Sequence, residues 1–406
     1  MLEKFKEIAY IIEPIFQHEN EEDKLKEIYS LVESAGAEIY SHVIYPVREI
    51  TPATFIGSGK LEEIKNEILL TDVNIVIFDG ELSPSQTLNI SAALNGVKVI
   101  DRTTLILDIF ALNAVSSEGK AQIELAQLKY IYPRLKGKGE ALSRLGGGIG
   151  TRGPGETKLE TDRRHIRSRI SALENKLNEL ESRRSLQMKR REKNSCKTVA
   201  IVGYTNAGKS TLLNALTGAD AYVQDKLFAT LDPLLRKIKL ENFEVVLVDT
   251  VGFVKNIPHH IIEAFKSTLE LAVKSDLILN VCDGSGNWQR ELEVTIETLE
   301  SFENLPKMIT VINKCDKIAS FDLFPKDAVF ISAANGVGLD KLKYAINKAF
   351  EDYYSVYKIQ IPYDKLNAFN KLTPYIDSVS YEYLDTLVVV SFSIQKRFLS
   401  KFSDFI

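Results

Sequence analysis

Over the first 115 residues, short apolar runs alternate with segments that carry apolar side chains at helical spacing. The apolar runs predict strands at 8–12, 39–44, 73–78 and 97–100, and the amphipathic segments predict helices at 22–34, 60–70 and 85–94. Because such alternation is typical of a parallel sheet with crossover helices, we expect an N-terminal α/β domain over residues 1–115. Its Gly57-Ser-Gly-Lys60 sequence has the wrong spacing for a phosphate loop, and a glycine turn that begins a helix explains it.

Residues 116–196 predict two long helices around a glycine-rich loop. Apolar residues recur at intervals of three and four, at Ala121, Leu125, Leu128, Tyr132 and Leu135 and again at Ile166, Ile170, Leu173, Leu177 and Leu180. Two seams of matching length predict an antiparallel helical hairpin, and Pro133 should end or kink its first helix.

The tip of this hairpin combines glycine with basic side chains. Six glycines lie between positions 146 and 155, with Arg144 before them and Lys158 after them. Glycine allows close backbone approach to a sugar-phosphate surface, and arginine supplies phosphate or stacking contacts. A flexible linker is the alternative, but a linker does not need flanking helices that bring its ends together. We therefore expect the tip to bind nucleic acid.

Residues 197–353 contain a phosphate-binding loop in its required setting. The apolar run 198–202 leads into Gly203-Tyr-Thr-Asn-Ala-Gly-Lys-Ser210, and a helical segment follows from Thr211. The backbone N–H groups of such a loop point at phosphate oxygens, Lys209 would neutralise the β and γ charges, and the Ser210 hydroxyl would reach Mg²⁺.

A second apolar run, 245–249, ends in Asp249-Thr-Val-Gly252. Asp249 is placed to hold Mg²⁺ through a water molecule, and the Gly252 N–H is placed to meet a γ-phosphate. Thr230 lies between the two motifs, where a switch threonine completes Mg²⁺ coordination. We therefore assign Ser210, Thr230 and Asp249 to the metal, and Lys209, Thr230 and Gly252 to catalysis.

The base is indicated by Asn313-Lys-Cys-Asp316, which follows the apolar run 308–312. Asp316 would accept hydrogen bonds from N1–H and the 2-amino group of guanine, and adenine would leave this carboxylate without donors. Lys314 would pack its stem on the base, and Ser332 to Ala334 would offer an N–H to O6. In this order the motifs predict a doubly wound GTP-binding domain. Its nucleotide contacts are assigned to Gly203, Tyr204, Thr205, Asn206, Ala207, Gly208, Lys209, Ser210, Thr211, Phe228, Ala229, Thr230, Leu231, Asp232, Asp249, Thr250, Val251, Gly252, Asn313, Lys314, Asp316, Ser332, Ala333 and Ala334.

Two residues set the expected catalysis apart from that of Ras-like proteins. Phe253 stands where those proteins place the glutamine that orients water, so hydrolysis should be slow until a partner reorganises the site or another group positions the water. Asn206 completes the G-x-x-N-x-G-K-S pattern of potassium-activated GTPases, in which the asparagine oxygen helps bind a monovalent cation. K⁺ is therefore a candidate cofactor beside Mg²⁺.

Residues 354–406 predict a small α+β domain in which no chemistry is identified. Its pattern gives strands at 356–361, 378–383 and 387–392 and helices at 364–372 and 396–402.

Composition adds limits on class and location. With 45% hydrophobic and 26% charged residues the chain is typical of soluble globular proteins, and it has neither a membrane-length apolar stretch nor a signal peptide. We expect a cytoplasmic location, with peripheral membrane association left open. Three cysteines without C-x-x-C pairing argue against a disulfide framework and a zinc site.

Positive charge is concentrated in one segment. Between Lys129 and Lys193 there are 18 Lys and Arg residues and 8 Asp and Glu residues, although the whole chain has a net charge of −4. A polyanion could therefore bind this segment, and a charged, solvated helix pair is the alternative.

The chain resembles the HflX family of ribosome-associated GTPases over roughly residues 1–350. The resemblance rests on the nucleotide motifs together with Asp101-Arg-Thr103, Ile106 to Phe110, Glu118-Gly-Lys120, Glu124 to Leu128, Gly146 to Arg164 and Phe228 to Pro233. It implies a GTPase that binds the large ribosomal subunit, inserts its hairpin toward the peptidyl-transferase centre, and splits or rescues stalled ribosomes. Contacts with ribosomal RNA would then fall to Arg144, Gly147, Gly148, Arg152, Gly155 and Lys158.

Three functions stay open at this point. The first, which we favour, is a monomeric ribosome-binding GTPase of translation. The second is a GTPase of ribosomal-subunit assembly, which would bind immature particles. The third is an RNA-remodelling or nucleotide-sensing protein with a regulatory GTPase, in which a chain ending near residue 195 would keep full RNA activity.

Overall fold

The computed structural model describes residues 7–17, 20–134, 154–193, 197–218, 234–241, 243–250, 252, 269–300, 302 and 304–406, and at 23, 154–160, 181 and 184–193 it describes the backbone alone. The described residues up to 181 form one compact unit, and those from 182 onward form a second.

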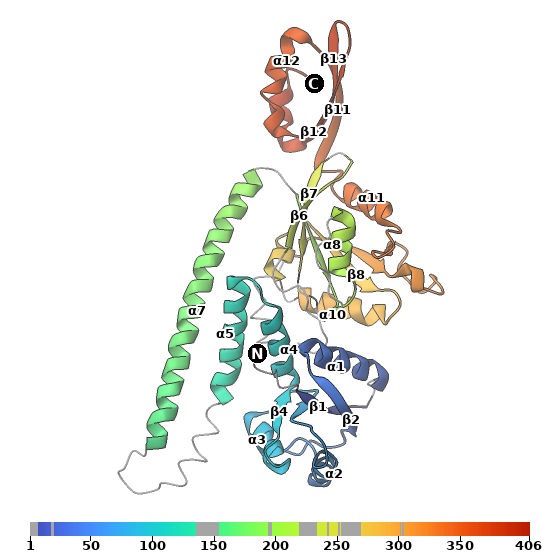
Figure 1. Ribbon diagram of the computed structural model, residues 1–406. Helices are drawn as coiled ribbons and strands as arrows, with labels where there is room; N and C mark the ends of the chain where they lie inside the picture. Colours follow the sequence, from blue (N-terminus) through green and yellow to red (C-terminus); the bar gives the residue numbers. More distant parts are fainter. Residues whose placement is uncertain are drawn as a thin grey trace, which may run out of the picture. The chain divides into compact units, whose positions relative to one another are not determined.

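A parallel sheet with strand order β2-β1-β3-β4 organises the first unit (Figure 1). Every predicted strand and helix of this region is confirmed to within a few residues, and Gly57 is the N-cap residue of α2. The elements are β1 (Ile8–Ile15), α1 (Glu21–Ala35), β2 (Glu38–Pro46), α2 (Ser58–Ile68), β3 (Ile75–Phe78), α3 (Pro84–Ala93), β4 (Lys98–Asp101) and α4 (Arg102–Asn113). The sequence pattern did not predict α4, because this helix is buried along most of its length and lacks a polar stripe.

The predicted helical hairpin is formed by α5 (Ser117–Arg134) and α7 (Pro154–Lys193). Buried Ala121, Leu125 and Leu173 pack between the two helices, as the two seams indicated. Ion pairs also join the two helices, with 2.6 Å between Arg169 Nε and Glu124 Oε1 and 2.8 Å between Lys129 Nζ and Glu174 Oε1. Pro133 lies inside α5, one residue before the last described residue of this helix, so the expected end or kink at Pro133 is not tested.

A buried polar cluster ties the last turn of α5 to the sheet. The Tyr130 hydroxyl donates to the Asp101 carboxylate at the end of β4. Arg134 Nη2 donates to the same carboxylate at 3.1 Å and to Leu82 O at 2.8 Å, and its guanidinium lies over the Tyr130 ring. The hairpin therefore leaves the sheet from a fixed point.

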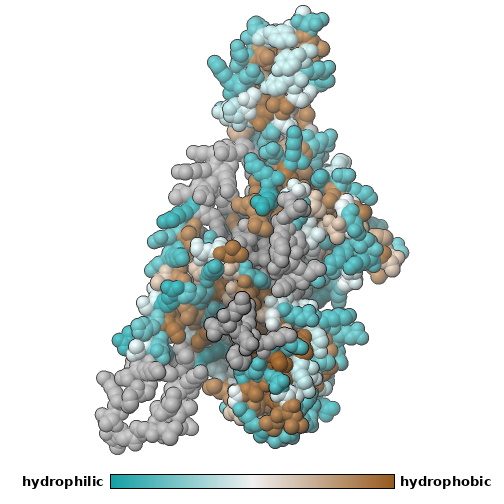
Figure 2. All heavy atoms as spheres, in the orientation of Figure 1, coloured by the Kyte–Doolittle hydropathy of each residue, from teal (hydrophilic) through white to brown (hydrophobic). Residues whose placement is uncertain are grey.

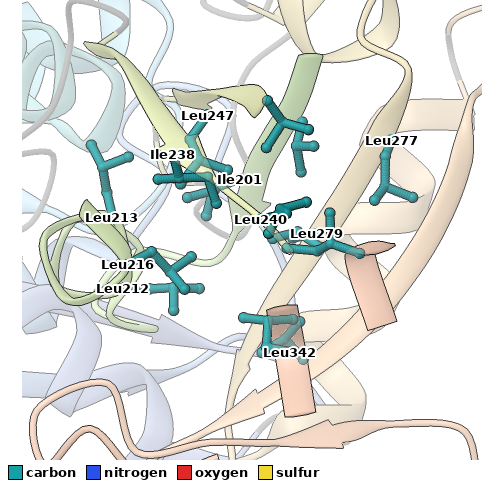
Figure 3. Close-up of a cluster of buried hydrophobic side chains, with 14 of the residues drawn as sticks. Ile201, Leu212, Leu213, Leu216, Ile238, Leu240, Leu247, Leu277, Leu279 and Leu342 are labelled. Carbon is teal, nitrogen blue, oxygen red and sulfur yellow. The ribbon is translucent and has the colours of Figure 1, made fainter. Parts of the chain in front are cut away.

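A six-stranded sheet with order β10-β9-β8-β5-β7-β6 forms the centre of the second unit. All of its neighbouring strands are parallel except β6 and β7, as in a doubly wound α/β domain. Its elements are β5 (Lys197–Gly203), α8 (Lys209–Thr217), β6 (Leu234–Lys239), β7 (Glu244–Asp249), β8 (Leu277–Asp283), α10 (Trp288–Glu300), β9 (Lys307–Asn313), η1 (Cys315–Lys317), β10 (Val329–Phe330) and α11 (Leu339–Ala349). Figure 3 shows the core of this domain, where side chains of the central strands meet those of α8 and α11.

The C-terminal part is an antiparallel sheet with order β11-β13-β12, covered on one side by helices. Its elements are β11 (Tyr354–Pro362), α12 (Tyr363–Asn370), η2 (Thr373–Tyr375), β12 (Ile376–Tyr383), β13 (Leu387–Gln395) and η3 (Lys396–Phe402). The α-helix predicted at 396–402 is wrong in type, since η3 is a 3₁₀-helix. A three-residue turn places Leu399 and Phe402 on one face, and both pack on the small core. Tyr354 buries its ring in the core of the preceding domain and stacks on Phe243 at 4.0 Å.

No helix within the described ranges is long and apolar enough to cross a membrane. On the face drawn in Figure 2, hydrophilic residues are spread among the hydrophobic ones on the coloured surface.

Candidate functional site

The phosphate-binding loop joins the end of β5 to the start of α8. Gly208 has φ +88°, and a Cβ atom there would lie 2.2 Å from Asn313 Nδ2, so this position needs glycine. Asn206 is exposed and also has a left-handed backbone, with φ +62°. The loop therefore ends at a helix N-terminus, where backbone N–H groups bind anions.

Lys209 is buried, and its side chain bonds to a backbone carbonyl oxygen of the phosphate-binding loop. Its Nζ atom donates to Tyr204 O at 2.7 Å. Burial lowers the pKa of Lys209 to about 8, although the carboxylates of Asp249 and Glu291 attract its proton. Phosphate oxygens would place negative charge beside this buried amine and so stabilise its protonated form. The lysine therefore favours an anionic ligand.

Two of the three residues assigned to Mg²⁺, Ser210 and Asp249, lie together where β7 ends. The Ser210 hydroxyl donates to Asp249 Oδ2 at 2.8 Å, and Asp249 is fully buried. A hydroxyl beside a carboxylate is the donor set that Mg²⁺ prefers, so these residues fit the ion. Gly252 is close by, because a Cβ atom on it would lie 2.8 Å from Lys209 Nζ. Thr250 has a different task, since its buried hydroxyl donates to Ile201 O at 2.8 Å and braces β5.

Asn313 joins the two halves of the site. Its Nδ2 atom donates to Ala207 O at 2.8 Å, and its Oδ1 atom accepts from the Ala333 N–H at 2.9 Å. The side chain therefore connects the phosphate-binding loop with the segment Ser332 to Ala334. Sequence analysis placed Asn313 in the site without a role, and the structure supplies that role.

Asp316 is exposed at the place where a guanine edge is expected. A hydrogen bond from the Ser332 side chain holds the pKa of Asp316 below its usual range, so the carboxylate is an ionised acceptor near neutral pH. The N–H groups of Ser332 and Ala333 already donate to Val337 O and Asn313 Oδ1. Ala334 is therefore the candidate N–H donor to O6.

Two acidic residues of this neighbourhood, Asp283 and Glu291, were missed by sequence analysis. Asp283 stands at the end of β8, and its Oδ2 atom lies 2.5 Å from Lys314 Nζ. Lys314 has a left-handed backbone with φ +58°. The Asp283 N–H in turn donates to Glu291 Oε2 at 2.8 Å. Neither acid belongs to a motif, and the only signal was that Asp283 ends an apolar strand at the edge where the other site residues lie.

Several of the assigned residues fall outside the described part. Phe228, Ala229, Thr230, Leu231, Asp232 and Val251 lie there, as do Phe253 and the tip residues Arg144, Gly147, Gly148 and Arg152. Gly155 and Lys158 lie in α7, where the backbone alone is described.

Three known families match successive parts of the chain. Residues 22–111 match "GTP-binding GTPase N-terminal", residues 113–191 match "GTP-binding GTPase Middle Region", and residues 198–314 match "50S ribosome-binding GTPase".

Individual proteins are similar over most of their length. "GTPase HflX" of Caldanaerobacter subterraneus is 50% identical over 91% of this chain and 87% of its own. "GTPase HflX" of Lacrimispora saccharolytica is 50% identical over 80% of this chain and 78% of its own. Among solved structures, a GTP-binding protein of Sulfolobus solfataricus in complex with GDP is 26% identical over 84% of this chain and 98% of its own, with a TM-score of 0.46.

Proposed function

Because the chain belongs to the GTPase HflX family and is a GTPase, we propose that it works on the ribosome, binding the large subunit and splitting or rescuing stalled ribosomes under stress. We infer a monomer that acts in the cytoplasm, where ribosomes are found. The proposal is supported by the family description of residues 198–314 and by the basic hairpin.

The nucleotide site supports the following division of roles. Lys209 moves its Nζ from Tyr204 O to the phosphates, and the loop N–H groups hold the same oxygens. Ser210 and, through water, Asp249 would hold Mg²⁺, which would supply neutralisation of the phosphate charge. Asp316 reads the guanine edge, and Thr230 and Gly252 respond to the third phosphate. Guanine nucleotide state then sets the surface offered to the partner.

The hairpin is the observation that carries the ribosome role. Its helices are held in register by a buried seam and by ion pairs, so residues 135–153 connect two fixed ends. On α7, Arg163 and Arg167 lie about the ring of Tyr132 on α5, and Arg167 Nη2 donates to the Tyr132 hydroxyl at 2.6 Å. The guanidinium groups of the exposed Arg167 and the half-buried Arg163 fit a phosphate backbone.

The test is GTP turnover with and without purified large subunits. Subunits should stimulate the intact chain, and the stimulation should fall steeply with salt because counterions are released on binding. A chain in which a short linker replaces residues 146–155 should keep its basal turnover and lose the stimulation.

Matched charge variants sharpen this test. Arg163→Glu with Arg167→Glu should weaken subunit binding by about tenfold or more, whereas Lys60→Glu with Lys65→Glu on α2 should leave it unchanged. No stimulation of the intact chain would overturn the ribosome role, and equal stimulation of the linker variant would overturn the role of the tip. Binding to immature particles alone would indicate the assembly function instead.

Asn206 supports a further proposal, that K⁺ accelerates hydrolysis at this site. Its exposed left-handed position in the loop leaves the side-chain oxygen available beside the phosphates. Turnover should be several-fold faster in K⁺ than in Na⁺ at matched ionic strength, and Asn206→Ala should remove the difference. Identical rates in the two salts for the unaltered chain would refute the proposal.

A further inference from the structure

We propose that Glu291 is a positioning residue for guanine nucleotide binding, that it acts through Asp283 on Lys314, and that its carboxyl group takes up a proton when nucleotide fills the site. Glu291 belongs to the first turn of α10 and to none of the nucleotide motifs. The inference rests on the proposed packing of Lys314 against the base, but it does not depend on the ribosome.

The turn after β8 is held from both sides. On one side, Glu291 Oε2 accepts the Asp283 N–H at 2.8 Å. On the other, the Gly284 N–H donates to Asn313 O at 2.9 Å, and Asp283 Oδ2 lies 2.5 Å from Lys314 Nζ. The turn is therefore clamped between α10 and the base-binding loop.

The Asp283 carboxylate has little freedom within this turn. Its Oδ1 atom accepts from the N–H of Ser285 at 2.9 Å and from the Ser285 hydroxyl at 2.6 Å, while Oδ2 faces Lys314. Lys314 has a left-handed backbone, so its direction is set by such contacts and not by a helix or strand. Loss of the Glu291 acceptor would release the Asp283 backbone and with it the lysine.

The groups around Glu291 explain why its carboxyl group can take up a proton. Asp283 and Cys282 of β8, Lys209 of the phosphate-binding loop and Lys314 of the base loop face this carboxyl group. Burial raises the pKa of Glu291 to about 7, and Asp283 adds to this, while the Asp283 N–H and the two lysines oppose it.

Phosphates bound by Lys209 would cancel part of the attraction that keeps Glu291 ionised. The site would then bind a proton together with the nucleotide, so affinity should be higher at lower pH. A neutral Glu291 still accepts the Asp283 N–H through its carbonyl oxygen, so the clamp survives protonation.

The experiment is calorimetric titration of the full chain with GDP and Mg²⁺ between pH 6 and pH 8, in two buffers of different ionisation enthalpy. The unaltered protein should take up a fraction of a proton at pH 7, and its Kd should rise several-fold more between these pH values than that of Glu291→Gln. Because GDP titrates in both proteins, the difference between them reports Glu291 together with its charge coupling to Lys209. Glu293→Gln, on the exposed face of α10, is the matched control and should behave as the unaltered chain.

The positioning role is tested by Glu291→Ala, which should weaken GDP binding by about tenfold at both pH values, whereas Glu291→Gln should restore it to within about twofold at pH 6. In a chain that already carries Lys314→Ala, the Glu291→Ala effect should disappear, because the two residues act in series. The positioning role would be overturned if the effects of Glu291→Ala and Lys314→Ala on GDP affinity were fully additive, or if Glu291→Ala left the affinity unaltered.

Proton uptake would be overturned if GDP affinity had the same pH profile in Glu291→Gln and in the unaltered chain. This second test does not need the alanine variant, so it also holds if that variant does not fold. Unaltered affinity of Lys314→Ala alone would instead refute the assignment of that lysine to the base.

Discussion

At the scale of single residues, one buried amide makes the phosphate and base sites a single unit. Asn313 is 3% exposed and bonds to Ala207 O and to the Ala333 N–H. Neither backbone group lies in a helix or strand, so the side chain replaces the partners that regular structure would give them. The conformation of two loops therefore depends on one side chain.

Replacing Asn313 by Ala should weaken GDP binding by about ten- to a hundredfold. The change leaves two backbone groups without partners, and each costs about 1–3 kcal/mol when buried. Calorimetric titration with GDP measures the effect, and the unfolding midpoint of the nucleotide-free chain controls for a loss of fold. Unchanged affinity would contradict the bridging role.

At the scale of elements, buried ionisable side chains fasten helices to strand ends in the first unit. Glu13 near the end of β1 lies 3.1 Å from Lys24 Nζ of α1, and Arg102 at the start of α4 lies 2.6 Å from both Asp79 and Glu27. Burial, together with the neighbouring Asp79 carboxylate, raises the pKa of Glu13 well above its usual range. The folded unit therefore holds Glu13 protonated where the unfolded chain would ionise it.

This difference predicts how pH changes stability. A raised pKa in the folded state means that its contribution to stability is fully present below the usual glutamate range and is lost as pH rises toward the raised value. Glu13→Gln should remove that loss, so its advantage over the unaltered chain should grow between pH 6 and pH 8, by at most about 1.4 kcal/mol per pH unit. Urea unfolding of the first unit at several pH values measures this, and parallel pH dependences would argue against a buried neutral glutamic acid.

At the scale of the whole molecule, the described nucleotide residues all belong to the second unit. A ligand stabilises only the fold that binds it, by about 2.7 kcal/mol at a hundredfold excess over Kd. Through the described residues, nucleotide is therefore coupled directly to the second unit.

Scanning calorimetry of the full chain should show this separation. GDP should raise the unfolding temperature of the second unit and leave that of the first in place, and ADP should move neither, because Asp316 has no donors to accept from adenine. Glu13→Gln should shift only the first transition, which identifies it. A single transition that moves as one with GDP would show that the units unfold together.

The sequence predicted those parts in which local chemistry is decisive. Gly57, the hairpin seam and the strands that carry Asp249 and Asn313 could be placed because turns, heptads and alternation are local signals. Helix α4 was missed because burial on most sides removes its periodicity, and η3 because three and four residues per turn look alike over seven positions. Asp283 and Glu291 were missed because their meaning lies in contacts between elements.

The ring of Tyr354 has a consequence for the order in which this chain can fold during synthesis. It is the first residue of β11, yet it completes the core of the nucleotide-binding domain by stacking on Phe243. Domains fold from the N-terminus as they emerge, so the first unit can form while most of the chain is still being made. The nucleotide-binding core has to wait for residue 354 of 406. A nascent chain arrested before that codon therefore carries every nucleotide motif but not the aromatic ring that closes their core.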